Sequence, residues 1–74
     1  MRYDFILDVS NEQSPIPVIR TSELLDIVPT GAILKVIVNK ESAVKNIKTL
    51  ISNKSYELLN NTNDPSAFEL YIKK

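Results

Sequence analysis

Two periodicities organise the apolar residues of this chain. Apolar and polar residues alternate over residues 2–8 and again over residues 67–73, which predicts a strand at each end of the sequence. Residues 32–38 form a nearly continuous apolar run interrupted only by Lys35, which predicts a central strand covered on most of both sides. A shorter apolar segment at residues 55–60 predicts one further strand.

Two other segments repeat their apolar residues at helical spacing. The helix predicted over residues 15–27 has one broad apolar arc, which consists of Ile16, Val18, Leu24, Leu25, Ile27 and Val28. Arg20 and Thr21 fall inside this arc, and we expect them to reach towards the helix start. The helix predicted over residues 40–53 has a narrower stripe, which consists of Ala43, Val44, Ile47, Leu50 and Ile51. Asn39 is its expected N-cap.

Turn-forming residues separate these segments. The loop at residues 9–13 contains Asn11, the residue there best suited to a left-handed backbone conformation. Pro29-Thr30-Gly31 ends the first helix with the only glycine of the chain. The polar residues 61–66 predict the turn of a hairpin between the last two strands.

The resulting order of elements is strand, helix, strand, helix, strand, strand. Right-handed crossovers then place both helices on one face of a mixed four-stranded sheet. We therefore predict an α+β fold, a two-layer α/β sandwich of βαβαββ order, as a single domain over residues 1–74. The second face of the sheet is expected to be open to solvent.

Composition narrows the possible chemistry. The chain has 74 residues, with nine basic and nine acidic side chains, so no broad electropositive field favours nucleic acid. It contains neither cysteine nor histidine, which excludes thiolate metal sites, disulfides and imidazole catalysis. We expect no metal and no cofactor. The charged N-terminal residues do not match a signal peptide and no stretch approaches membrane length, which favours a cytoplasmic protein.

The most informative stretch is Ser14-Pro15-Ile16-Pro17, where the loop after the first predicted strand ends and the first predicted helix begins. Proline suits the first helical turn because the amide hydrogen that it lacks would have no intrahelical partner there. Ser14 is then the expected N-cap, whose hydroxyl would accept a hydrogen bond from an amide of that turn. The spacing of the two prolines is not that of a PxxP ligand.

The residues from Leu7 to Thr21 resemble the motif of the TusA/SirA-like sulfur carriers, in which Leu-Asp, a glycine-containing loop and Cys-Pro-x-Pro precede a helix with an early basic residue. The resemblance continues through the Pro29-Thr30-Gly31 turn, the start of the second helix at residues 41–44 and the closing strand at residues 68–73. It implies the same βαβαββ sandwich that the periodicities predict.

Three positions depart from that pattern. Asn11 stands where the family has glycine, Glu12 where an apolar residue is usual, and Ser14 where the family has its cysteine. In the family that cysteine accepts sulfur as a persulfide and passes it to a partner, which requires a thiolate. A serine hydroxyl is hardly ionised at neutral pH and forms no stable analogue of the persulfide. As written, this protein cannot carry sulfur on itself.

Several interpretations of these residues stay open. Ser14 is most simply a helix cap, although a Ser–Lys nucleophile is formally possible and a serine introduced by design would look the same. Arg20 is either a solvated charge or a contact to a partner or an anion at the helix start. Asp8 is expected to bond loop amides at the strand end.

Two functional hypotheses follow, together with a weaker third. The first is a non-catalytic, protein-binding or regulatory relative of the sulfur carriers, which uses the surface formed by Asp8, Asn11, Glu12, Ser14, Pro15, Pro17 and Arg20. The resemblance implies a protein partner from a sulfur relay, such as a desulfurase, a rhodanese-like protein or a DsrE-like protein. The second is a working persulfide carrier whose cysteine has been replaced by Ser14. The third is an RNA-binding module that stacks bases on Tyr3, Tyr56 and Tyr71 across the open sheet face. Enzymatic activity in its own right is not expected.

Overall fold

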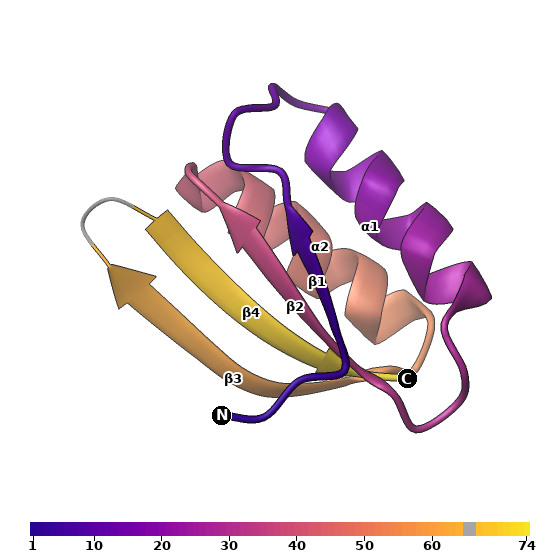
Figure 1. The fold of residues 1–74 in the computed structure, drawn as a ribbon. Coiled ribbons are helices and arrows are strands. Elements are labelled where there is room, and N and C mark those ends of the chain that lie inside the picture. The colour runs from indigo at the N-terminus through magenta and orange to yellow at the C-terminus, as the bar shows by residue number, and fades with distance from the viewer. Residues whose placement is uncertain (65–66) are drawn as a thin grey trace.

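The computed structural model describes the backbone of residues 1–64 and 67–74, and side chains except those of residues 63–66. The elements follow the predicted order: β1 (Phe5–Asp8), α1 (Ile16–Ile27), β2 (Ile33–Val38), α2 (Glu41–Asn53), β3 (Glu57–Asp64) and β4 (Ala67–Lys73). The strands form one sheet in the order β1-β2-β4-β3, in which β1 and β2 are parallel and the other pairs are antiparallel. Both helices cover the same face of this mixed sheet (Figure 1), so the predicted two-layer sandwich is confirmed.

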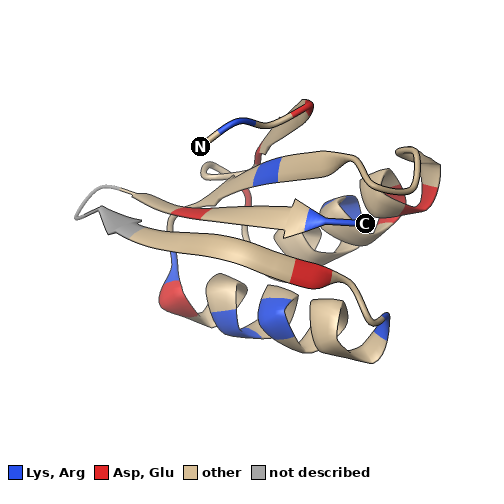
Figure 2. Cartoon of the chain, turned by 90° about the horizontal axis from the view of Figure 1, so that it is seen from below, with Lys and Arg blue, Asp and Glu red and all other residues tan. Residues whose placement is uncertain are grey.

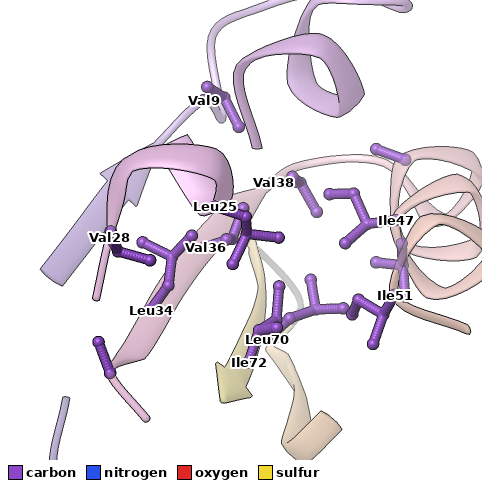
Figure 3. Packing of buried hydrophobic residues seen from close by; sticks show 13 residues of the cluster. Val9, Leu25, Val28, Leu34, Val36, Val38, Ile47, Ile51, Leu70 and Ile72 are labelled. Carbon is purple, nitrogen blue, oxygen red and sulfur yellow. The ribbon is translucent and has the colours of Figure 1, made fainter. Parts of the chain in front are cut away.

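The hydrophobic core lies between the helices and the sheet. Alternate residues of β2 point towards the helices, and Leu34, Val36 and Val38 are fully buried. Their register partners on β4 are Ile72, Leu70 and Phe68. Leu25 and Val28 cover one part of this surface, and Ile47 and Ile51 of α2 cover another (Figure 3). The period-two pattern of β4 and the helical stripe of α2 therefore predicted much of this core, because burial of apolar surface is the main stabilising term of the fold. The alternation in β1 did not, since Phe5 is 40% exposed.

β3 is longer than predicted, and it corrects the predicted turn. Residues 61–64 continue the strand, with Asn61 opposite Leu70 and Thr62 opposite Glu69. Asparagine and aspartate are poor strand residues, but strand propensity depends strongly on the neighbouring strand, and β4 supplies one along this whole length. The remaining predicted turn residues, 65–66, lie outside the described part of the chain.

The predicted N-cap of α2 is also wrong. Lys40, rather than Asn39, is the N-cap, and no side chain caps the helix. The amides of Ala43 and Val44 donate to the carbonyl of Lys40 at 3.1 and 3.3 Å, so the first helical hydrogen bond begins one residue later than predicted. β1 likewise begins at Phe5 rather than at residue 2.

The apolar arc of α1 differs from the prediction at two positions. Ile27 is 77% exposed, because α1 ends there and the extended backbone of Val28 brings Val28 into the core instead. Thr21 is fully buried, and its Oγ1 donates to the carbonyl oxygen of Pro17 at 2.7 Å. Arg20 is exposed.

The sheet face opposite the helices is partly covered rather than open. The N-terminal segment lies on this side of the sheet (Figure 2), and Tyr71 is only 6% exposed. The Lys35 Nζ atom lies 5.2 Å from the ring centroid of Tyr3 and 5.6 Å from that of Tyr71. It also lies 3.4 Å from Glu69 Oε2. Desolvation lowers the pKa of Lys35, but Tyr71 and Glu69 outweigh it, so the net pKa is raised.

This arrangement affects the RNA hypothesis. Tyr3 and Tyr71 interact with each other, with ring centroids 6.4 Å apart, whereas Tyr56 packs against the core. The three tyrosines therefore do not form a shared stacking platform on the second sheet face.

Candidate functional site

The predicted site residues lie together at one edge of the sheet. β1 and β2 are parallel, so both strands end at this edge and each is followed by a helix. The loop from β1 to α1 rises above the edge and turns into the first turn of α1 (Figure 1). Asp8 ends β1, Asn11, Glu12 and Ser14 lie in the loop, and Pro15, Pro17 and Arg20 accompany the helix start.

Asp8 stabilises the beginning of this loop, as predicted. Its Oδ1 atom accepts hydrogen bonds from the Ser10 hydroxyl at 2.6 Å and from the Ser10 amide at 3.0 Å. These two bonds, the hydroxyl first, hold the pKa of Asp8 below its ordinary value. Val9, which follows Asp8, is buried in the core and accepts a hydrogen bond from the Glu12 amide at 3.1 Å. The loop is thus tied to the sheet edge at its first residues.

Asn11 is exposed and does not have a left-handed backbone conformation. In the described residues, positive φ angles occur only at Gly31 and Ser55. Asn11 therefore does not adopt the left-handed backbone conformation that would favour glycine at this position.

Ser14 is exposed, but it is not the helix cap that the sequence predicted. α1 begins at Ile16, Pro15 occupies the N-cap position, and no side chain forms a capping hydrogen bond. The Ile16 amide donates to the carbonyl of Gln13 at 2.9 Å and the Ile19 amide to the carbonyl of Pro15 at 3.2 Å. The helix thus begins after Ser14, and backbone carbonyls accept the hydrogen bonds of the Ile16 and Ile19 amides. The Ser14–Pro15 peptide bond is cis.

The two prolines face different surroundings. Pro15 is exposed beside Ser14, whereas Pro17 is buried at the second helical position. Buried Pro17 is also the residue whose carbonyl accepts the Thr21 hydroxyl, so the first two turns of α1 are fixed against the core. The exposed residues at this corner therefore include Ser14 and Pro15, together with Glu12 and Arg20.

Ile19 is an exposed residue at the start of α1 that was not predicted as a site residue. Its side chain is 45% exposed although isoleucine is usually buried. It lies next to Arg20 in the second turn of α1. The signal that could have found it is an isoleucine outside the predicted apolar arc.

Among the described residues, no hydrogen bond joins the Ser14 hydroxyl to a basic side chain that could act as its general base. The described residues also contain no group of His, Cys, Asp or Glu that could hold a metal ion. In the same part of the chain, neither helix has the length and apolar character needed to cross a bilayer.

Comparison with known proteins identifies the family. The family model described as sulfurtransferase TusA matches residues 5–74. A putative sulfur carrier protein of Methanocaldococcus jannaschii is 32% identical over 68 residues, which are 92% of this chain and 91% of that protein. The crystal structure of a SirA-like protein from Desulfitobacterium hafniense has the same fold, with a TM-score of 0.82, 22% identity and coverage of 95% of this chain and 96% of that chain. The chain belongs to the TusA sulfurtransferase family.

Proposed function

We propose that this protein is a non-catalytic member of the TusA family that binds a protein partner of a sulfur relay. The observation that carries the proposal is that the sequence contains no cysteine, while the exposed residue at the motif position is Ser14. A persulfide requires a thiolate, and a hydroxyl cannot replace it. The family membership supports a role in sulfur traffic, and the missing thiol supports a role other than carrying the sulfur.

The surface around Ser14 has the character of a small protein-binding site. Ile19 provides an exposed apolar side chain, and Arg20 provides a guanidinium, the type of residue that is enriched among energetically important interface residues. Glu12 adds an exposed acidic group in the loop that leads to this helix. Pro15 and the buried Pro17 restrict the backbone under this surface, so less conformational entropy is lost when a partner binds.

Binding to a purified cysteine desulfurase, measured by calorimetry, tests this proposal. Ile19→Ala and Arg20→Ala are each expected to weaken binding about tenfold. Pro17→Ala is less suitable, because Pro17 is buried and its loss would alter the helix start. Ile27→Ala is the matched control, because Ile27 is also an exposed isoleucine of α1 but lies at the other end.

Two results of these binding measurements would contradict the proposal. Equal loss of affinity in Ile19→Ala and Ile27→Ala would show that the helix start is not the binding surface. Absence of binding to a desulfurase, a rhodanese-like protein and a DsrE-like protein alike would refute a role as a relay-binding protein.

A second candidate function is a working carrier whose cysteine has been replaced. The observation in its favour is the exposure of Ser14 directly before a helix that begins with the Pro-x-Pro spacing of the family. Ser14→Cys would then gain the mass of one sulfur atom when incubated with a cysteine desulfurase and free cysteine. Ser42→Cys is the matched control, because Ser42 is also exposed in the first turn of a helix but lies in α2.

The two candidates predict different results for these variants. A persulfide on Ser14→Cys but not on Ser42→Cys would support the carrier, because it would show that this position accepts sulfur once it holds a thiol. No persulfide on either variant, with both folded and both thiols reactive to an alkylating agent, would eliminate the carrier.

A further inference from the structure

A second surface feature lies away from Ser14, between α2 and the hairpin of β3 and β4. It is a pocket of about 520 Å³. Its walls are formed by Glu41, Ser42, Val44, Lys45, Lys48, Asn61 and Phe68. This volume falls within the range of small-molecule sites, about 300–1,000 Å³.

The helix side of the pocket is cationic. Lys45 and Lys48 are three residues apart on α2, so they lie on the same side of the helix. The basic residues of α2 appear as blue segments along the helix in Figure 2. Neither ammonium group forms a salt bridge within the described residues. Glu41 at the start of α2 contributes one negative charge, so the two lysines leave the lining with a net positive charge.

The strand side of the pocket contains an unusual acceptor. The Oδ1 atom of Asn61 is buried and accepts no hydrogen bond in the described part of the chain. Buried side-chain oxygens nearly always accept at least one, because burial removes the water that would otherwise donate. Because Asn61 lines the pocket, a rotation of its side chain would bring this oxygen to an N–H or O–H donor of a bound ligand.

The remaining lining is apolar. Val44 on α2 belongs to the hydrophobic core, Phe68 at the beginning of β4 packs against that core, and both residues line the pocket. The pocket thus combines two ammonium groups, an unsatisfied acceptor and an apolar surface. A complementary ligand needs an anionic group, a hydrogen-bond donor and an apolar group within a small volume.

We propose that this pocket binds a carboxylate next to an amide N–H and an apolar side chain, which is the chemistry of an N-acylated amino acid or of a peptide C-terminus. The carboxylate pairs with Lys45 and Lys48, the N–H donates to Asn61 Oδ1, and the apolar side chain lies against Phe68 and Val44. This site is separate from the Ser14 surface and does not depend on the function proposed for it.

Titration with N-acetyl-leucine, followed by backbone and side-chain amide NMR, tests the site. The expected result is saturable shifts of the Asn61 side-chain amide and of Phe68. N-acetyl-leucinamide, which lacks the carboxylate, is expected to bind about tenfold more weakly, because a charged hydrogen bond is lost. Equal binding of acid and amide, or no saturable shift, would overturn the proposal.

Variants separate the parts of the site. Lys45→Gln with Lys48→Gln is expected to weaken binding of the acid about tenfold and leave the amide unchanged. Lys54→Gln is the matched control, because Lys54 is an exposed lysine that follows α2 and does not line the pocket. Equal losses in the pocket and control variants would refute the pairing. Asn61→Leu removes the acceptor, and undiminished binding of N-acetyl-leucine to this variant, if it folds, would likewise refute the assignment.

The same chemistry can come from a free metabolite or from the end of a protein chain. A decapeptide ending in leucine distinguishes the two sources. Tighter binding than N-acetyl-leucine would identify a partner's C-terminus as the ligand, and equal or weaker binding would identify a small N-acyl amino acid. Calorimetry with Ile19→Ala keeps this result distinct from the partner binding proposed above, because that variant is expected to bind N-acetyl-leucine normally.

Discussion

Thr21 is a polar residue in the first half of α1, and its side chain is completely buried. Its hydroxyl donates to the carbonyl of Pro17 at 2.7 Å, and its methyl group is buried with the rest of the side chain. In a regular helix the Pro17 carbonyl also accepts from the amide of residue 21, so it keeps a donor when the hydroxyl is removed. Either the hydroxyl or the methyl group could therefore account for most of the stability that Thr21 contributes.

Three substitutions separate these contributions. Thr21→Val keeps the shape of the side chain but loses a hydrogen bond whose net contribution is about 0.5–1.5 kcal/mol. It also removes a hydroxyl group from the core, which is favourable, so we expect the free energy of unfolding to fall by about 0.5 kcal/mol. Thr21→Ser loses a methyl group, which costs about 1 kcal/mol with its cavity. Thr21→Ala loses both and regains some helix propensity, so we expect a loss of about 1.5 kcal/mol.

Urea denaturation followed by circular dichroism measures these differences, provided that the slope m is the same in all variants. In a domain of this size, 1 kcal/mol corresponds to about 4–8 °C in Tm, so the series is also resolved by thermal unfolding. A loss in Thr21→Val as large as that in Thr21→Ala would refute the reasoning. It would show that the hydroxyl bond, and not the packing of the methyl group, holds the first turns of α1 in place.

Three further predictions concern stability. The carboxylates of Asp4 and Asp8 have folded-state pKa values below the ordinary value of 3.8. Asp4 accepts a hydrogen bond from the Ile33 amide. The two ionised carboxylates stabilise the fold above pH 3.8, and this stabilisation is lost as the pH falls through their folded-state pKa values. In Asp4→Asn, the free energy of unfolding measured in urea should therefore decrease less steeply as the pH is lowered. Lys74 Nζ donates to the carbonyls of Asp26 and Val28 at 3.3 and 3.0 Å, so Lys74→Met should cost about 1 kcal/mol in urea unfolding. Leu70 is fully buried, and Leu70→Ala should cost about 3 kcal/mol, seen as a lower Tm.

Measured results could contradict each of these predictions. An unchanged acid transition in Asp4→Asn would mean that the Ile33 amide bond does not persist in solution. Unchanged stability in Lys74→Met would show that water replaces the lysine at the end of α1. A loss below about 1 kcal/mol in Leu70→Ala would show that the space between α2 and the sheet collapses around the missing side chain.

Local periodicity predicted most of the fold because the buried residues repeat at the spacing of the element that carries them. The stripe of α2 specified both the helix and the face that it buries, whereas the apolar run of β2 specified a central strand but not which of its faces is fully buried. Residues 61–64 could not be recognised as strand in the same way. Their sequence has the composition of a turn, and the pairing with β4 that makes them a strand depends on residues later in the chain.

The candidate site was predicted in position but not in detail. The spacing of Pro15 and Pro17 located the start of α1 within one residue. The role of Ser14 as a cap was wrong, because α1 begins at Ile16, one residue later than predicted, so that Pro15 and not Ser14 occupies the N-cap position. The pocket beside Asn61 was not predictable either, since it exists only where α2 meets β3 and β4.

The topology explains why both proposed surfaces lie where they do. β1 and β2 run parallel, and each leads directly into a helix at the edge where the strand ends. At such an edge the connecting loops are shaped by the sheet but are not part of its hydrogen-bonded ladder, so their residues can vary without loss of the core. The Ser14 loop follows β1, and the pocket opens at the start of α2, which follows β2. The loop that holds Ser14 can therefore differ in sequence while the strands and helices beside both surfaces keep their packing.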